Sequence, residues 1–422
     1  MDLRNGGRGV DVTFGGGGIR LGTGGENGFA ASFKLLVTVE FRDPRCFWAA
    51  FPAQRLPFGM TYFKKPAGRA SDGRAAIDFF AQGLGLPFLS PYLQSIGSNY
   101  SHGANFATPL LFLNSFSKPM ISHINVFHTG IECKILAQIK STLTINEDLI
   151  IVLLICLQVY ITKFHNLRVA GIAHLHIAKV TCFIHRENVS IGGYLPPRNV
   201  FSQSLYTIDI GQNDFTSNAG TLGIEGIKQY VPQVASQIAS TIKELYDIGG
   251  RTFLVANLAP IGCFPAFLTE LPHDASDLDI YGCMISYNDA VVYYNNLLKE
   301  RLGQIRDQLL DASVIYVDTH SIKLELFQHP KDHGFVFGNK ACCGAGGGAY
   351  NFNPQVFCGN TKIINGINVT ATACTDPGEY VSWDGIHATE AANKIIAQAV
   401  LNGSLFDPPF PLSEVCHLHS VH

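Results

Sequence analysis

The sequence predicts an α/β fold with a mainly parallel sheet. The 422 residues are 47% hydrophobic and 15% charged, a composition typical of a folded globular chain rather than a disordered one. Between residues 201 and 402, short apolar segments of strand type alternate with longer segments of helical spacing. Strands that alternate with helices need crossover connections, which make neighbouring strands parallel and cover both faces of the sheet.

The predicted elements follow in a regular order. The strand-type segments, which are short and mostly apolar, are residues 204–210, 252–256 and 313–318. The helix-type segments, in which apolar residues recur every three or four positions, are residues 231–245, 286–310 and 389–401. Gly249 and Gly250 end the first helix, and Gly403 ends the last. Because ligands bind beyond the carboxyl ends of the strands in such sheets, residues 211–214 are candidates for a site.

The net charge argues against a nucleic-acid partner, and the length of the apolar runs argues against a transmembrane segment. The chain has 30 Lys and Arg residues against 33 Asp and Glu residues, a net charge of -3. It therefore has no basic surplus to neutralise a phosphate backbone, and we expect no nucleic-acid partner. The longest apolar run, residues 149–161, is shorter than the ~20 residues that a bilayer core requires, so we expect no transmembrane segment.

Cysteines and glycosylation sequons favour an oxidising compartment. Of the 11 cysteines, those from Cys263 to Cys416 are clustered. The sequence contains no CxxC pair, which a zinc ribbon would require. The Asn-x-Ser/Thr sequons that are glycosylation candidates begin at Asn99, Asn188, Asn368 and Asn402. Residues 1–28 contain no apolar segment of the length that a signal peptide uses. The sequence therefore suits a secreted glycoprotein in which no signal peptide is readable.

Asp384 and His387 form the first chemical pattern. An Asp three residues before a His, on a turn that leads into a helix, can hold one imidazole nitrogen while the other faces a reacting hydroxyl. This is the arrangement of a general base. The alternative interpretation is a capping turn with an exposed histidine.

Asn213 and Gly103 form the second pattern, which concerns an oxyanion. The amide of Asn213 follows a strand and can donate to developing negative charge, although an Asx-turn would also explain it. Gly103, in SHGANFA, lacks a Cβ, so a backbone N–H can approach the same oxyanion. An ordinary tight turn is the alternative there.

Two further patterns carry no prediction of a ligand. Residues 344–349 fit the GxGxxA pattern of dinucleotide loops, but no strand precedes them and no helical pattern follows, so a surface loop is the better interpretation. The His and Cys clusters in residues 174–185 and 417–422 lie on no regular element that would fix ligand geometry. We predict neither a metal site nor a cofactor.

In combination, the motifs resemble those of the plant GDSL esterase/lipase family, part of the SGNH hydrolases, and are most similar to its early-nodulin-like and fucosidase-like members. The similar stretches are residues 46–108 and 192–416, with the motifs FGMTYFKKPAGRASDGR, SHGANFA, YTIDIGQNDF, NLAPIGCFP, ACCGAGGGAYNFN and WDGIHATEAAN. The resemblance implies a three-layer α/β/α, flavodoxin-like fold and hydrolysis of small-molecule acyl esters through an acyl-enzyme, in an exported protein. It also implies that Asp384 and His387 are the acid and base, that Gly103 and Asn213 form the oxyanion hole, and that cysteines from Cys263 onward pair as disulfides.

The sequence departs from the family at the nucleophile. The family's serine lies in a Gly-Asp-Ser motif on the first strand, and this chain contains no Gly-Asp-Ser. Residues 1–45 stand in its place, residues 109–190 interrupt the hydrolase domain of residues 46–416, and residues 417–422 form a tail. We hypothesise that both foreign stretches arise from gene-model error, the inner one resembling a translated intron. We therefore predict a GDSL-type carboxylic ester hydrolase that is weakly active or inactive, with a non-catalytic secreted glycoprotein that binds a lipid or carbohydrate ester as the alternative.

Overall fold

The structure, a computed structural model, describes residues 35–39, 55–91, 103–105, 202–247, 249–346, 348–415 and 419–421. Its strands in the main sheet are β1 (Leu35–Val39), β2 (Ser90–Pro91), β3 (Gly103–Asn105), β4 (Ser204–Ile208), β5 (Thr252–Ala256), β6 (Ser313–Val317) and β11 (Phe406–Asp407). Within the described residues they form a 7-stranded sheet in the order β11-β6-β5-β4-β1-β3-β2. All neighbours are parallel except β11, which is antiparallel to β6. The predicted mainly parallel sheet is confirmed.

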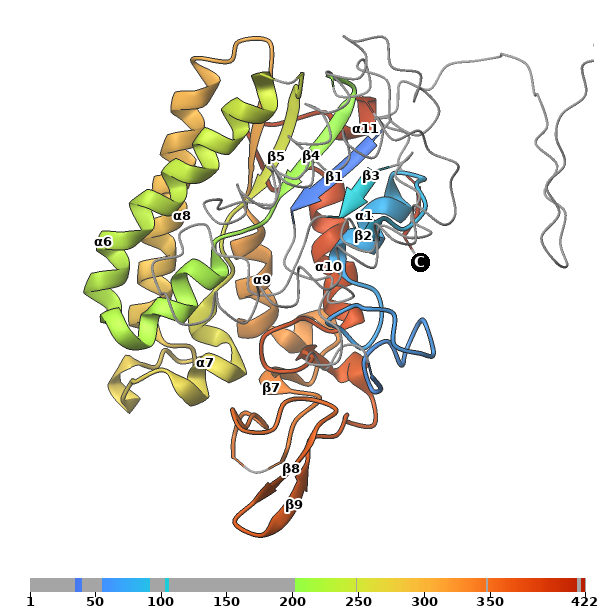
Figure 1. The fold of residues 1–422 in the computed structure, drawn as a ribbon, viewed down its shortest axis with the longest axis vertical. Helices are drawn as coiled ribbons and strands as arrows, with labels where there is room; N and C mark the ends of the chain where they lie inside the picture. The colour runs from blue at the N-terminus through green and yellow to red at the C-terminus, as the bar shows by residue number, and fades with distance from the viewer. Residues whose placement is uncertain are drawn as a thin grey trace, which may run out of the picture. The chain divides into compact units, whose positions relative to one another are not determined.

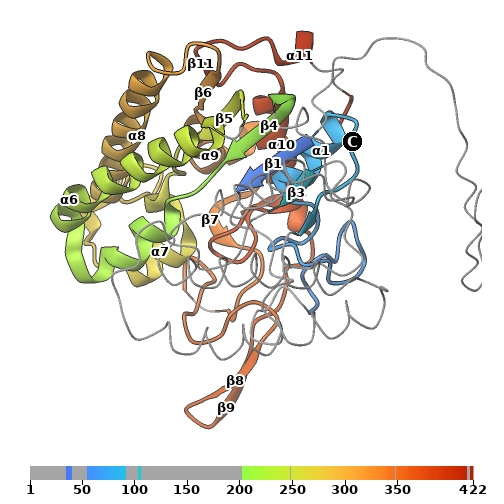
Figure 2. The same ribbon diagram turned by 45° about the horizontal axis from the view of Figure 1, so that its top comes forward.

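Helices cover both faces of the sheet (Figures 1 and 2). The longer helices are α1 (Ala76–Gly83), α6 (Gln212–Asp247), α8 (Ile285–Arg306), α9 (Thr319–Gln328) and α10 (Glu390–Leu401). Successive side chains of a strand point to opposite faces. Accordingly, Tyr206 and Phe253 pack with α6 and α8 in one core, whereas Leu205 and Leu254 pack with α1 and α10 in another. The sheet is therefore the middle of three layers, as an α/β/α fold requires.

The predicted elements match the observed ones closely, with one main difference. The strand at 252–256 has the predicted bounds, and Thr389 caps α10 by accepting a hydrogen bond from the amide of Ala392. Helix α6 extends back to Gln212, well before the predicted start at residue 231, and contains a break at Gly223, where φ is 63°. Only the second part of α6 has a regular apolar stripe in the sequence.

β1 is a strand that the sequence patterns did not identify. It lies between β3 and β4, with Val39 paired to Ile208 and Leu36 paired to Gly103. The segment 1–45, which we interpreted as unlike its neighbours, therefore supplies a central strand of the sheet.

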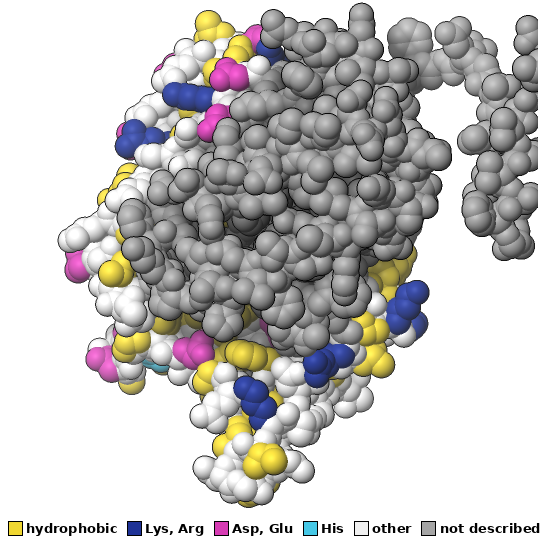
Figure 3. Space-filling view, in the orientation of Figure 1, with side chains coloured by type: hydrophobic (Ala, Val, Ile, Leu, Met, Phe, Trp, Pro, Cys, Tyr) yellow, Lys and Arg dark blue, Asp and Glu magenta, His cyan; other side chains and the backbone are white. Residues whose placement is uncertain are grey.

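The remaining elements are short. They are η4 (Ile261–Cys263), α7 (Pro265–Glu270), η5 (Ala275–Asp277), η6 (Pro330–His333), β7 (Phe337–Ala341), β8 (Thr361–Ile364), β9 (Ile367–Thr370), η7 (Pro377–Glu379), β10 (Tyr380–Ser382) and α11 (Leu412–Val415). β8 and β9 form a projecting hairpin whose turn has positive φ at Asn365 and Gly366, as an Asn-Gly hairpin turn requires (Figure 1). Apolar side chains are visible on this hairpin at the bottom of Figure 3, where Ile363 and Ile367 are exposed.

Three disulfides occur in the described part of the chain. They join Cys263 to Cys283, Cys342 to Cys374 and Cys343 to Cys358. The expected pairing of cysteines from Cys263 onward is thus present, while Cys416 lies outside the described residues. The sequon residues Asn368 and Asn402 are exposed. Asn99 and Asn188, the insert 109–190 and the cluster 174–185 also lie outside the described residues, and no described helix is long and apolar enough to cross a membrane.

Candidate active site

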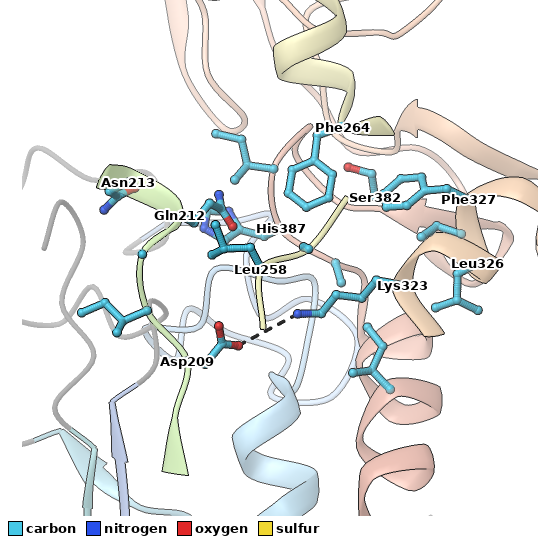
Figure 4. A pocket seen from close by; sticks show the side chains of 17 residues that line it. Asp209, Gln212, Asn213, Leu258, Phe264, Lys323, Leu326, Phe327, Ser382 and His387 are labelled. Atoms are coloured by element: carbon cyan, nitrogen blue, oxygen red, sulfur yellow. Dashed lines mark ion pairs between the residues drawn. The ribbon is translucent and has the colours of Figure 1, made fainter. Parts of the chain in front are cut away.

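A cavity of about 810 Å³, open to solvent, lies beyond the carboxyl end of β4. Its wall is formed by the β4–α6 loop, the segment after β5, helix α9 and residues 381–388 (Figure 4). Much of the lining is apolar and includes Leu258, Phe264, Leu326 and Phe327. The polar side chains in the wall are Asp209, Gln212, Asn213, Lys323, Ser382 and His387. This is the place at which parallel α/β sheets bind ligands.

His387 is oriented in this wall by Asp384. Its Nδ1 lies 2.7 Å from Oδ2 of Asp384, and the other carboxylate oxygen accepts hydrogen bonds from the backbone amides of Ile386 at 3.1 Å and His387 at 2.8 Å. Burial by itself would raise the pKa of the Asp384 carboxyl, but the nearby His387 charge and these hydrogen bonds lower it overall. An ionised Asp384 keeps the proton of the neutral ring on Nδ1, and Nε2 is then the nitrogen able to accept one.

The loop that carries Asp384 and His387 is rigidly built. The amide of Trp383 donates to the carbonyl of His387 at 2.7 Å, closing a tight turn. Gly385 has φ 98°, and a Cβ there would lie 2.6 Å from the ring of Phe352, so the turn requires glycine. Trp383 is fully buried in a cluster with the cysteines of two disulfides. The loop therefore holds its shape without help from a ligand.

Residues 69–74, from the GRASDGR motif, fasten this loop from the other side. Ser71 Oγ donates to the carbonyl of Ala388 at 3.0 Å, and Asp72 Oδ1 accepts from the amide of Glu390 at 2.7 Å. Arg74 forms an ion pair with Glu390 at 2.7 Å. We call these contacts the 69–74 clamp. Burial raises the pKa of Asp72, although its hydrogen bonds with Glu390 and Thr61 act in the opposite direction.

Asn213 lies at the rim of the same cavity as His387. It follows β4 directly, in the first turn of α6, and is 8% exposed. Figure 4 shows its amide at the edge of the cavity and turned away from His387. The structure therefore brings the predicted base and the predicted oxyanion amide to one cavity, from positions far apart in the chain.

Gly103 is placed differently. It is the first residue of β3 and pairs with Leu36, so it lies at the amino end of its strand. It does not belong to the described residues that line the cavity. Its place in the sheet is given by that pairing alone, and its oxyanion role stays a prediction.

The family resemblance predicts a nucleophile directly after the first strand, which corresponds to the carboxyl end of β1. This end adjoins the cavity, because Val39 pairs with Ile208, the residue before Asp209. In the sequence Val39 is followed by Glu40, Phe41 and Arg42, none of which is a serine. The serine among the described lining residues is Ser382, whose Oγ accepts a hydrogen bond from the Gly385 amide at 3.2 Å. In Figure 4 the ring of Phe264 is drawn between Ser382 and His387.

Comparison with known proteins identifies the family. The model of the GDSL-like lipase/acylhydrolase family matches residues 58–400. This chain belongs to that family. It is 53% identical over 377 residues to a GDSL esterase/lipase of Arabidopsis thaliana, covering 89% of this chain and 88% of the relative. The resemblance inferred from the motifs is confirmed, and ester hydrolysis is the activity of the family.

Two other relatives belong to the predicted subgroups. The GDSL esterase/lipase ENOD8 of Medicago truncatula is 35% identical over 370 residues, which is 87% of this chain and 85% of the relative. A protein named alpha-L-fucosidase 3, of Arabidopsis thaliana, is 37% identical over 360 residues, which is 84% of this chain and 86% of the relative.

Asp209 and Lys323 line the cavity but were not among the predicted site residues. Asp209 follows β4 and lies in the IDIGQND motif, so the rule that sites follow strands would have found it. Lys323 lies inside α9, where a lysine usually indicates a solvated helix face. Its placement in the cavity depends on how α9 packs against β7 and α10.

Proposed function

We propose that this chain is a carboxylic ester hydrolase by descent whose acid–base pair is intact and whose nucleophilic serine is missing. The observation that carries the proposal is the Asp384–His387 hydrogen bond of 2.7 Å in the wall of a cavity that Asn213 also lines. Residues 46–416 form the hydrolase domain, interrupted by 109–190, and residues 1–45 replace the nucleophile segment while still supplying β1.

The chemistry of the family assigns a role to each of these groups. A hydroxyl nucleophile at the end of β1 would lose its proton to Nε2 of His387, and Asp384 would stabilise the resulting imidazolium. The amide of Asn213 and a glycine N–H, for which Gly103 is the candidate, would donate to the tetrahedral oxyanion. Water would then hydrolyse the acyl-enzyme through the same base. Removal of the serine costs a serine hydrolase on the order of 10⁶ in kcat, so we expect this chain to hydrolyse esters weakly or not at all.

The substrate is an acyl ester of small or moderate size, and the site needs no metal or cofactor for this chemistry. Phe264, Leu326 and Phe327 offer an apolar surface to the acyl chain. Export is supported by the disulfides and by exposed sequons at Asn368 and Asn402, since disulfides persist mainly in oxidising compartments.

Restoring the missing motif tests the proposal. The triple variant Glu40→Gly/Phe41→Asp/Arg42→Ser places Gly-Asp-Ser directly after β1, and hydrolysis of 4-nitrophenyl butyrate is followed by absorbance. We expect a gain in rate of several orders of magnitude, because the cavity already holds the proposed base, His387, and the proposed oxyanion donor, Asn213. The matched control, Glu40→Gly/Phe41→Asp/Arg42→Ala, differs by a single oxygen atom and should show no gain.

His387 provides the second control. In the restored chain, His387→Ala should abolish the gain. A rate in the unaltered chain that already equals that of the triple variant would contradict the claim that the nucleophile is missing. Binding of an uncleaved ester by the unaltered chain, with no gain in the triple variant, would instead favour the non-catalytic glycoprotein that binds a lipid or carbohydrate ester.

A further inference from the structure

We propose that Asn368 carries an N-linked glycan whose first sugar packs on the exposed side chain of Ile363 and stabilises the β8–β9 hairpin. The sequon by itself predicts only that Asn368 is an acceptor for a glycan. The inference adds the contact with Ile363 and its structural role, and it does not depend on the proposed function.

The hairpin needs support from outside its own two strands. Within the described part of the chain, β8 and β9 pair only with each other and form a separate 2-stranded sheet. Figure 1 shows this hairpin projecting away from the main sheet. An isolated two-stranded hairpin is at best marginally stable in water. The disulfides of Cys358 and Cys374, which come before and after the hairpin, fix its base and leave the projecting strands to be stabilised in another way.

Asn368 and Ile363 lie opposite each other on one face of the hairpin. The strand register pairs these two residues directly. Opposite residues of an antiparallel pair point to the same face, with Cβ atoms about 4.5–5.5 Å apart. Thr361 and Thr370 form the next pair on this face, and their Oγ1 atoms lie 2.9 Å apart. All of these side chains are exposed, so the face offers an open surface on which a sugar can lie.

Ile363 is the large apolar side chain of this face. It is 74% exposed, and the sugar attached to the residue opposite it starts within reach of its side chain. A pyranose ring presents C–H groups on its faces, and the N-acetyl group of the first sugar ends in a methyl. Contact with these groups removes apolar surface of Ile363 from water, which is favourable roughly in proportion to the area covered. The glycan therefore supplies the packing partner that the hairpin itself does not provide for Ile363.

The modification is the transfer of an oligosaccharide from a lipid diphosphate donor. Asn368, Val369 and Thr370 supply the acceptor triplet. The side-chain nitrogen of Asn368 forms a bond to C1 of the first N-acetylglucosamine, and the bond from C1 to the phosphate oxygen of the donor breaks. The amide loses one proton as the lipid diphosphate leaves, so the step needs no oxidant or reductant.

Hydrogen exchange of the hairpin amides tests the contact. The full chain is secreted from insect cells behind a cleavable leader, and peptide mass spectrometry measures both the glycan on Asn368 and the exchange rates of residues 361–370. We expect these amides to exchange about fivefold or more slowly in the glycosylated chain than in Asn368→Gln, because opening of the hairpin returns Ile363 to water. In an Ile363→Thr background, which keeps a β-branched residue but removes most of the apolar surface, Asn368→Gln should leave the rates unchanged.

Ile367→Thr is the matched control. Ile367 is 68% exposed and directly precedes Asn368 in β9, so its side chain points to the opposite face of the hairpin. In this background the glycan should still slow exchange. Both isoleucines are exposed, so neither substitution removes a buried side chain.

Three results would each overturn the inference. They are a secreted chain in which Asn368 carries no glycan, a glycan that does not slow exchange of the hairpin, and equal protection by the glycan in the Ile363→Thr and Ile367→Thr backgrounds. None of them bears on ester hydrolysis.

Discussion

The two walls of the cavity differ in what holds them. The wall that carries His387 is fixed by disulfides, by a turn that requires Gly385 and by the 69–74 clamp. The rest of the wall is formed by the segments after β4 and β5 and by helix α9, and the strand beside β4, β1, is followed in the sequence by residues 40–42, which include no serine. The proposed acid–base pair, Asp384 and His387, lies on one turn with a separation of three residues, so the contact between the two side chains does not depend on a nucleophile.

The largest effect should come from breaking the pair itself. In the chain restored with Gly-Asp-Ser, Asp384→Asn should lower kcat by about 10⁴-fold, because an amide cannot hold the imidazole in the required tautomer or stabilise the imidazolium. Steady-state hydrolysis of 4-nitrophenyl butyrate measures it. Asp376→Asn changes an exposed cap at the start of η7 and should leave the rate unchanged. Equal rates in the two variants would remove Asp384 from the mechanism.

The next effect concerns the ion pair beside the clamp. Arg69 and Asp78 form two hydrogen bonds at 2.6 and 2.7 Å, and both side chains are almost fully buried. Asp78→Ala should lower the free energy of unfolding by about 3–5 kcal/mol, because it removes the carboxylate that forms the ion pair with a buried guanidinium. Denaturant titration measures the loss. Glu225→Ala breaks an exposed pair with Lys228 and should have little effect.

The disulfides allow the His387 wall to be loosened selectively. Cys343 and Cys358 close a loop of 15 residues, so Cys343→Ala/Cys358→Ala should lower stability by about 3 kcal/mol. Loss of the Cys263–Cys283 disulfide should lower stability similarly. In the restored chain, however, the first double variant should also reduce kcat, because its disulfide packs against Trp383. Equal kcat in the two double variants would show that the His387 loop does not need this support.

A smaller effect should appear in the dependence of stability on pH. The pKa of Asp384 is lowered in the folded protein. Its carboxylate therefore contributes to the free energy of unfolding above the unfolded-state pKa of about 3.9, and this contribution is lost as the pH falls through the folded-state pKa. The difference in unfolding free energy between the unaltered chain and Asp384→Asn should therefore be larger at pH 7 than at pH 3. A difference that grows toward acid would contradict the lowered pKa.

The smallest effect is expected at Asp72. Burial raises the pKa of Asp72 in the folded protein. Its contribution to the free energy of unfolding is therefore greatest at low pH and is lost as the pH rises through the folded-state pKa. Asp72→Asn keeps an oxygen to accept from the Glu390 amide and should change stability by less than about 1 kcal/mol at pH 7. Asp72→Ala removes that acceptor and should lower stability by about 1–3 kcal/mol. If both variants lose equal stability, the clamp does not depend on this hydrogen bond.

The sequence by itself determined the alternation of strands and helices from residue 204 onward and the contact between Asp384 and His387. These features depend on short-range spacing, which sets the faces of strands and helices and the reach of side chains within one turn. The same short-range information did not reveal β1, because its five residues have no distinctive alternation and their strand conformation depends on pairing with β3 and β4.

Only the tertiary structure decided which cysteines pair, that Asn213 and His387 share a cavity, and that Lys323 of α9 meets Asp209 after β4. Each of these depends on how elements from distant parts of the chain pack against one another. Such contacts are set by the burial of whole helix and sheet faces, which many side chains determine together and no local pattern specifies.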